Sequence, residues 1–315
     1  MSHGKRTGLS LFCGPNTAAA LLGVLVLTFA CLVASFYGCG SGKGGSTEPT
    51  GATFEQPTSL VMPQVSADGP SIDASHAADG YVVAHLSSTK RLKFQVAKDE
   101  MVYNYDLPND NTPVVYPVNM GNGAYVMRIM KNTEGNNYVE VDRLEENIKL
   151  KSEFAPFEIP NQFCNYNEQS ACVAKARELT ASATNQGEAV KSICDYIINN
   201  VSYDTNKAKT LTTTTGYIPN PDQTLQEGMG VCFDYASLGA AMLRSQGFPT
   251  KVITGYVTPG DLYHAWIMVY VDGSWKTGEF SVNPDTWSRV DLTFAASGSS
   301  EFTGDGTNYT ERYVY

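Results

Sequence analysis

Short apolar segments alternate with polar turns between about residue 80 and residue 151. The turns are rich in Asn, Asp, Gly and Pro and recur at a spacing of roughly ten residues, which is typical of an all-β domain. The candidate strands are Tyr81–His85, Leu92–Val96, Met101–Tyr105, Pro113–Tyr116, Ala124–Met130, Tyr138–Val141 and Asn147–Lys151. The pattern predicts a small antiparallel β-sandwich over residues 71–155. No catalytic cluster is visible there, so a structural or binding role is favoured.

The period of the apolar residues changes after Ala155-Pro156. Steps of three and four residues predict helices at Ala171–Ala183, Glu188–Val201 and from Cys232 to about Ser245. The Thr-rich run Leu211–Thr215 and the Pro-containing loop Tyr217–Asp222 interrupt this pattern, and strands are predicted at Thr250–Val257, Leu262–Val271 and Ser288–Phe294. Together these elements predict an α+β domain over residues 156–315.

The first part of the chain has the pattern of a secretory signal. Lys5 and Arg6 provide a basic start, and no charged residue occurs from Thr17 to Gly38, a stretch rich in Leu and Val. A basic start before an apolar stretch is typical of a signal peptide, here residues 1–38. The stretch is also long enough to span a bilayer, so an uncleaved anchor is the alternative.

Cys39 follows the small residue Gly38 at the end of the apolar stretch. The residues after it, 39–70, begin with a Gly/Ser-rich tether and continue as a Pro-, Ser- and Thr-containing linker. This arrangement resembles a bacterial lipoprotein signal, in which the cysteine is lipidated, although Phe36 stands where Leu is usual. The resemblance implies an extracytoplasmic protein held at the membrane through lipidated Cys39, with plain secretion as the alternative.

Composition excludes several classes of protein. The 42% hydrophobic content excludes general disorder, and 7 Cys in 315 residues are too few for a disulfide scaffold. With 22 Lys+Arg against 32 Asp+Glu, the formal net charge of −10 has the wrong sign for binding nucleic acid. No metal-ligand spacing and no calcium-loop pattern is visible, so we expect no metal and no cofactor.

Cys232 is placed where a cysteine can become a nucleophile. It follows Gly228-Met229-Gly230-Val231 and starts a predicted helix. Unpaired N–H groups and the helix dipole at such a position favour the thiolate, which is the nucleophilic form. The alternative is a buried structural cysteine at a Gly-rich helix entrance.

His264 is the base available to such a thiol in this half of the chain. It lies in the apolar strand-like run Leu262–Tyr270, and no other His follows residue 85. A lone His in an apolar strand is more often a packed core residue, but any Cys–His chemistry here must use it. A third group that orients the imidazole is expected downstream. The candidates are Asp272, Glu279, Asn283, Asp285 and Asp291.

Three separated motifs, Gly230–Ala236, His264-Ala265-Trp266 and Trp287–Phe294, together resemble the core of the transglutaminase-like superfamily. In its bacterial extracellular members a Gly-x-Cys leads a helix, His-Ala-Trp opens a strand, and a Trp-x-x-x-Asp-x-Thr-Phe run supplies the acid. Leu292 stands where Pro is more usual. The resemblance implies a papain-like/transglutaminase-like core with Cys232 as nucleophile, His264 as base and then acid, and Asp291 as the orienting carboxylate.

The roles of other residues near the motifs have two interpretations. The backbone N–H of Cys232 is the expected oxyanion donor. Gln226 lies at the offset of the oxyanion Gln in papain-like enzymes, although transglutaminase-like cores do not generally use it and a solvated loop residue is the alternative. Tyr263 and Trp266 either line the site or pack within the strand.

The remaining cysteines of the C-terminal half have simpler interpretations. Cys164 and Cys172 could form a disulfide outside the cytoplasm, with two free thiols as the alternative. Cys194 lies on the apolar stripe of its predicted helix and is expected in the core.

The sequence thus predicts an extracytoplasmic enzyme that transfers an acyl group through Cys232. With water as acceptor it is a peptidase or amidase acting on peptide or protein amides, cell-wall peptides included. With an amine as acceptor it is a cross-linking transglutaminase. A catalytically inactive binding protein is the third hypothesis. Among the three, the resemblance favours hydrolysis.

Overall fold

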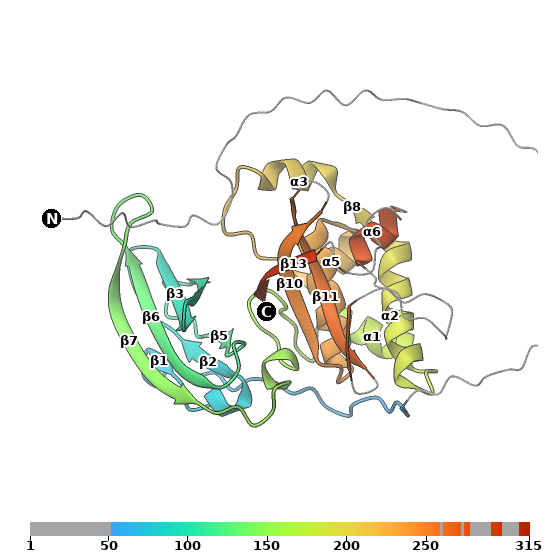
Figure 1. Cartoon of the computed structure of the whole chain (residues 1–315), viewed down its shortest axis with the longest axis horizontal. Helices are drawn as coiled ribbons and strands as arrows, with labels where there is room; N and C mark the ends of the chain where they lie inside the picture. The colour runs from blue at the N-terminus through green and yellow to red at the C-terminus, as the bar shows by residue number, and fades with distance from the viewer. Residues whose placement is uncertain (1–51, 259–260, 272–273, 278–290, 298–308) are drawn as a thin grey trace, which may run out of the picture.

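The computed structural model describes residues 52–258, 261–271, 274–277, 291–297 and 309–315 (Figure 1). The chain forms a β-sheet part at the left of the view and, beside it, a part that combines helices with a second antiparallel sheet. The predicted signal, Cys39 and the alternative acids Asp272, Glu279, Asn283 and Asp285 lie outside the described residues.

The N-terminal part contains two antiparallel sheets. Their strands are β1 (Ile72–Asp73), β2 (Tyr81–Ala84), β3 (Leu92–Lys98), β4 (Met101–Leu107), β5 (Val114–Pro117), β6 (Gly123–Asn132) and β7 (Tyr138–Ile148). One sheet has the order β1-β2-β5 and the other β4-β3-β6-β7. The rings of Phe94 and Tyr116, one from each sheet, lie 4.5 Å apart between them, so apolar side chains fill the space between the sheets. The predicted antiparallel β architecture is confirmed.

One predicted gap between two strands of this part is wrong. Tyr138–Val141 and Asn147–Lys151 were expected as separate strands, but β7 continues through Asp142–Glu146 and pairs with β6 along its length. β7 is an edge strand and most of its side chains are exposed. A run of charged residues therefore stays solvated on the strand and does not interrupt it.

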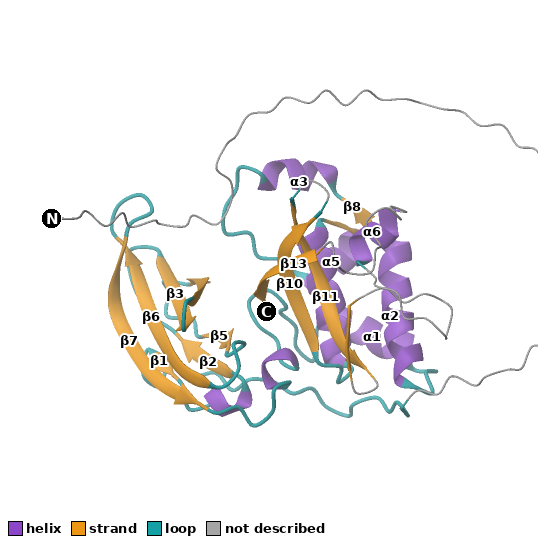
Figure 2. Cartoon of the chain, viewed as in Figure 1, coloured by secondary structure: helices purple, strands orange, loops and turns teal. Residues whose placement is uncertain are grey.

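The C-terminal part surrounds one central helix. The helices are α1 (Ala171–Thr180), α2 (Gln186–Asn200), α3 (Thr205–Leu211), α4 (Pro221–Glu227), α5 (Cys232–Ser245) and α6 (Leu292–Ser297). The strands are β8 (Ser202–Tyr203), β9 (Met229–Gly230), β10 (Thr250–Val257), β11 (Leu262–Val271), β12 (Ser274–Thr277) and β13 (Tyr309–Val314). Short 3-10 turns η1 (Ala77–Asp79) and η2 (Ala155–Phe157) occur earlier in the chain. The sheet has the order β12-β11-β10-β13, and Figure 2 shows α1, α2 and α5 beside it and α3 beyond the ends of its strands.

The long periodic elements agree with the sequence prediction, and the short ones do not. The predicted helices correspond to α1, α2 and α5, and the strands β10 and β11 have the predicted bounds. α3 and α4 were not predicted, because a helix of two turns is too short to show a period: α3 ends where the Thr-rich run begins, and α4 begins in the predicted loop Tyr217–Asp222. Their starts carry the usual signals, since the side chains of Asp204 and Asn220 accept backbone N–H bonds as N-caps.

The strand expected over Ser288–Phe294 is wrong in its described portion. Leu292 begins the helix α6, while residues 288–290 lie outside the described part of the chain. The Asp291 Oδ1 atom accepts hydrogen bonds from the backbone N–H groups of Thr293 and Phe294. This is the bonding of a helix N-cap, so the same Asp that was expected within a strand starts a helix instead.

α5 is the buried centre of the C-terminal part. Every residue from Asp234 to Ser245 is buried, and the helix packs against β10 and β11. At its far end the buried Arg244 donates three hydrogen bonds to backbone carbonyls. Nε bonds to Thr250 at 2.8 Å, Nη1 to Ile159 at 2.7 Å and Nη2 to Tyr315 at 2.9 Å. This guanidinium therefore joins the helix to three separate segments of the chain.

Aromatic rings join the two parts of the molecule. Tyr103 on β4 lies edge-on to Tyr313 and Tyr315, with centroid separations of 5.3 Å and 5.5 Å. Its hydroxyl accepts the Val314 N–H at 3.0 Å, and Phe163 packs on Tyr315 with centroids 4.6 Å apart. The end of β13 is therefore fixed against the N-terminal sheets.

Candidate active site

Cys232 stands at the first position of α5, after a two-residue strand. β9 pairs in parallel with β8, which places Gly230 opposite Tyr203. A Cβ at Gly230 would lie 2.6 Å from the Cβ of Asp234, so the chain can approach the helix this closely only with glycine. Cys232 is half-buried and is the first residue of α5, the end of a helix whose dipole favours a negative charge.

His264 comes to this thiol from β11. It lies opposite Gly255 of β10, and its imidazole is almost completely buried. At Gly255 a Cβ would lie 2.0 Å from the Thr310 carbonyl oxygen, so this glycine lets β13 approach β10 next to the histidine. The backbone thereby brings the start of β13 close to the imidazole.

Asp291 is bonded to His264 and is itself firmly held. Its Oδ2 forms a short hydrogen bond with His264 Nε2 and accepts the Tyr309 hydroxyl at 3.3 Å. Its Oδ1 accepts the N–H groups of Thr293 at 3.0 Å and Phe294 at 3.1 Å. The Phe294 ring also stacks on the imidazole, with centroids 4.5 Å apart. Both partners of the pair therefore have a fixed orientation.

The charges around His264 favour its protonated form. Burial by itself lowers the pKa of the imidazole, but the charges of Asp291 and then Cys232, with hydrogen bonds to both, outweigh burial and raise the pKa to about 10. Since Nε2 is bonded to Asp291, Nδ1 is the ring nitrogen left for the thiol. The structure therefore brings Cys232, His264 and Asp291 together, and the arrangement suits an imidazolium between a thiolate and a carboxylate.

The other residues expected near the site have less direct positions. Gln226 is exposed on α4, as a solvated residue would be. Trp266 is buried in a small apolar cluster with Ile253 and Val257, so it packs within the sheet. Tyr263 is half-buried, and its hydroxyl donates to Thr254 Oγ1 at 2.9 Å.

The cysteine pair expected as a disulfide is present as two free thiols, Cys164 and Cys172, both fully buried. Burial raises the pKa of Cys164 to about 11 and that of Cys172 well above its usual range. Burial of Cys194 on α2 raises its pKa in the same way, and it lies in the core as predicted. Burial therefore keeps these three thiols protonated and away from solvent, whereas the side chain of Cys232 is half-exposed.

Tyr203 is a neighbour of the thiol that the sequence patterns did not reveal. It lies on β8 with 43% of its surface exposed, opposite Gly230 of β9. Burial of the phenol raises the pKa of Tyr203, and the nearby Cys232 charge adds to this shift. Tyr203 is therefore close enough to Cys232 to interact with its charge. The short strand that carries it shows no recognisable period.

Asp234 is a second residue that was missed. Its side chain is fully buried two positions after Cys232, and its Oδ2 accepts the Val231 N–H at 2.8 Å. Lys207 and Tyr217 complete its bonding. The available signal was the one acidic residue of a mostly apolar helix, since a buried carboxylate requires partners.

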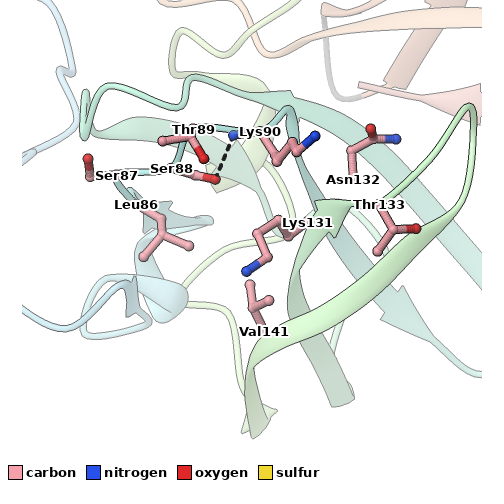
Figure 3. A pocket seen from close by; sticks show the side chains of 9 residues that line it. All are labelled: Leu86, Ser87, Ser88, Thr89, Lys90, Lys131, Asn132, Thr133 and Val141. Atoms are coloured by element: carbon pink, nitrogen blue, oxygen red, sulfur yellow. Dashed lines mark hydrogen bonds between the residues drawn. The ribbon is translucent and has the colours of Figure 1, made fainter.

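A groove on the N-terminal sheets lies away from this site (Figure 3). Its lining residues are Leu86, Ser87, Ser88, Thr89, Lys90, Lys131, Asn132, Thr133 and Val141. They include hydroxyl and amino groups but no thiol, imidazole or carboxylate.

Comparison with family models identifies the domain that carries the three residues. Residues 173–291 match the transglutaminase-like superfamily. The matched segment of this transglutaminase-like domain runs from α1 to Asp291 and includes Cys232 and His264. The match supports a transglutaminase-like or cysteine-protease-like function in general and identifies no substrate. Comparison with curated proteins gave no match.

Solved structures are similar to parts of the chain. A candidate cysteine protease from Cytophaga hutchinsonii is 18% identical, with a TM-score of 0.34, over 62% of this chain and 73% of that one. A candidate protease from Parabacteroides distasonis is 18% identical, with a TM-score of 0.30, over 65% and 40%. Red sea bream transglutaminase is 11% identical, with a TM-score of 0.27, over 61% and 45%. This chain therefore spans less than half the length of the latter two proteins.

The described residues carry neither of two further features. Among them, no helix is long and apolar enough to cross a membrane. The same residues hold no group of three or more His, Cys, Asp or Glu side chains that could bind a metal ion.

Selective alkylation tests the position of Cys232. Iodoacetamide at neutral pH should modify Cys232 first, because Cys164, Cys172 and Cys194 are buried and protonated. His264→Ala should slow the reaction by about tenfold, since the thiolate loses its cationic partner. Peptide mass mapping of the native protein measures both effects. Cys194→Ser serves as a control with unchanged labelling, and equal labelling of Cys194 and Cys232 would contradict the assignment.

The raised pKa of His264 predicts a pH-dependent contribution to stability. The ordinary value is 6.5 and the folded value about 10, so the charged ring stabilises the fold fully below pH 6.5. This contribution should decline as the pH rises from 6.5 to about 10. Urea denaturation at several pH values should show wild type losing its advantage over His264→Gln across that window. A difference that does not change with pH would contradict the predicted shift.

Proposed function

We propose that Cys232, His264 and Asp291 are the catalytic triad of a cysteine peptidase or amidase that acts on peptide or protein amides. One observation carries this proposal: a buried imidazole, held by a fully bonded carboxylate, stands beside a half-exposed thiol at a helix start. The transglutaminase-like match supports the general class, and the reaction and the roles of the three residues are our proposal.

The geometry suits a two-step acyl transfer. The thiol proton passes to His264, and the Cys232 sulfur forms a bond to the carbonyl carbon of the substrate amide. The carbon–nitrogen bond then breaks while the imidazolium gives its proton to the departing nitrogen, leaving a thioester. Water attacks the thioester with His264 as base, the carbon–sulfur bond breaks, and the carboxylic acid leaves. We assign stabilisation of the oxyanion of each tetrahedral intermediate to the backbone N–H of Cys232.

Asp291 and its neighbours keep the imidazole ready for both proton transfers. The two backbone N–H groups and the Tyr309 hydroxyl prevent the carboxylate from turning away. Phe294 covers one face of the ring and excludes water from it. The pair therefore needs little reorganisation when charge develops on the imidazole.

Water is the acceptor that requires no further binding site, because a thioester on half-exposed Cys232 is open to solvent. For this reason we propose hydrolysis. A primary amine that reached the same thioester would give transamidation, which is the reaction of a cross-linking transglutaminase.

A substrate screen tests the reaction. Cell-wall peptides and glutamine-containing proteins should release free acid or ammonia with wild type and none with Cys232→Ala. Asp291→Asn should lower kcat/KM by about a hundredfold or more, because the imidazole loses its orienting charge. A fluorescent primary amine in the same assay separates the two acceptors. Incorporation that outpaces hydrolysis would replace the peptidase proposal with a transferase, and Cys194→Ser is the matched control.

We also propose that the enzyme is extracytoplasmic and held at the membrane by lipidated Cys39. The basic start, the uncharged stretch and the small residue before this cysteine support the proposal. The tether that follows would place the catalytic part away from the bilayer surface.

Mass spectrometry of the natively expressed protein tests the anchor. The first residue should be Cys39 carrying a lipid, and Cys39→Ser should release the protein from membranes into the soluble fraction. A membrane-bound protein with an intact N-terminus would support the uncleaved anchor instead, and cleavage without a lipid would support secretion.

A further inference from the structure

A buried carboxylate lies beside the proposed nucleophile and takes no part in the triad. Asp234 is 0% exposed and stands two positions after Cys232 on α5. Its Oδ2 accepts the Val231 N–H at 2.8 Å and lies 2.7 Å from Lys207 Nζ. Its Oδ1 accepts the Tyr217 hydroxyl in a short hydrogen bond. The bonded Val231 is the residue directly before Cys232.

Two of these partners belong to one surface segment, residues 204–217, which contains α3. No residue of α3 is buried, so apolar packing does not hold this helix in place. Figure 1 shows α3 at one end of the C-terminal part, near β8. Lys207 Nζ lies 4.7 Å from the centre of the Tyr217 ring, so the two partners also contact each other. Asp234 is therefore the point at which this segment is attached to α5.

The charge of Asp234 matters because of its place. Its Oδ2 is bonded to the N–H of the residue that precedes the thiol, and an uncompensated buried carboxylate at this end of α5 disfavours a nearby anion such as a thiolate. Several other groups act on Cys232. His264, backed by Asp291, faces it from β11, and Tyr203 faces it from β8. Within the described residues near the thiol, Lys207 on α3 is the cation paired with Asp234.

We propose that Lys207 is a positioning residue for Cys232: its ammonium group balances the charge of the buried Asp234 carboxylate two positions after the thiol, at the start of α5. The inference rests on the proposed role of Cys232 as nucleophile. It adds a residue whose effect on the thiol passes through Asp234 and not through the substrate.

The test is the pH profile of Cys232 alkylation by iodoacetamide in the full-length protein. Lys207→Met should slow the reaction at pH 7 by about tenfold and move the midpoint of the profile to higher pH, because the buried anion is no longer balanced. Lys207→Arg keeps the charge and should restore a profile close to that of wild type. A Lys207→Met profile that coincides with wild type would overturn the proposal.

Opposite shifts separate a charge effect from a structural one. Asp234→Asn alone should move the midpoint to lower pH, because the cation remains and the anion is gone. The double variant Lys207→Met/Asp234→Asn carries neither charge, and its rate should return to within about threefold of wild type. A double variant as slow as Lys207→Met would show that displacement of the segment, and not charge, causes the loss, and would overturn the proposal.

Two controls complete the design. Tyr217→Phe removes a hydrogen bond but no charge, so the midpoint of the alkylation profile should stay unchanged. Circular dichroism shows whether each variant is folded. The readout is alkylation and not turnover, so the two proposals can fail separately. A wild-type protein that alkylates as expected but hydrolyses nothing would refute the proposed function and leave this inference standing.

Discussion

The three hydrogen bonds of the Arg244 guanidinium are the interaction on which the rest of the C-terminal part depends. A buried cation is tolerated only when its donors are satisfied, and here the acceptors come from residues far apart in the chain. Thr250 begins β10, Ile159 lies in the connection from the N-terminal sheets, and Tyr315 follows β13. With one end of α5 fixed in this way, the opposite end can present a thiol at a defined position.

The same closure supplies the histidine with its surroundings. β10 lies between β11, which carries His264, and β13, which begins with Tyr309. Because Gly255 allows β13 to approach closely, the Tyr309 hydroxyl reaches the carboxylate that orients the imidazole. The helix, the histidine strand and the last strand therefore form one structural unit. A change in the pairing of β13 would move Tyr309 and so disturb its hydrogen bond to Asp291. The effect on Cys232 would be indirect, through Asp291 and His264.

The sequence was informative where a long element or a spaced motif carried the signal. α5, β10 and β11 have strong apolar periods, and the motifs around Cys232, His264 and Asp291 were visible without coordinates. The element that holds Asp291 was mistaken for a strand, because helix N-capping depends on the direction of one side chain and not on a period. The contacts of Lys207 and Tyr217 with Asp234 could not be predicted from the sequence. They form only when the folded chain brings a surface segment against a buried carboxylate.

The aromatic contacts between the two parts have a consequence for how the molecule unfolds. Rings from β4 pack on those that end β13, and one continuous apolar core includes residues of both parts. A fragment cut before residue 156 would leave Tyr313, Tyr315 and Phe163 without much of their cover and would expose apolar surface to water. We therefore expect the two parts to unfold together, because the N-terminal sheets cover apolar surface of the catalytic part.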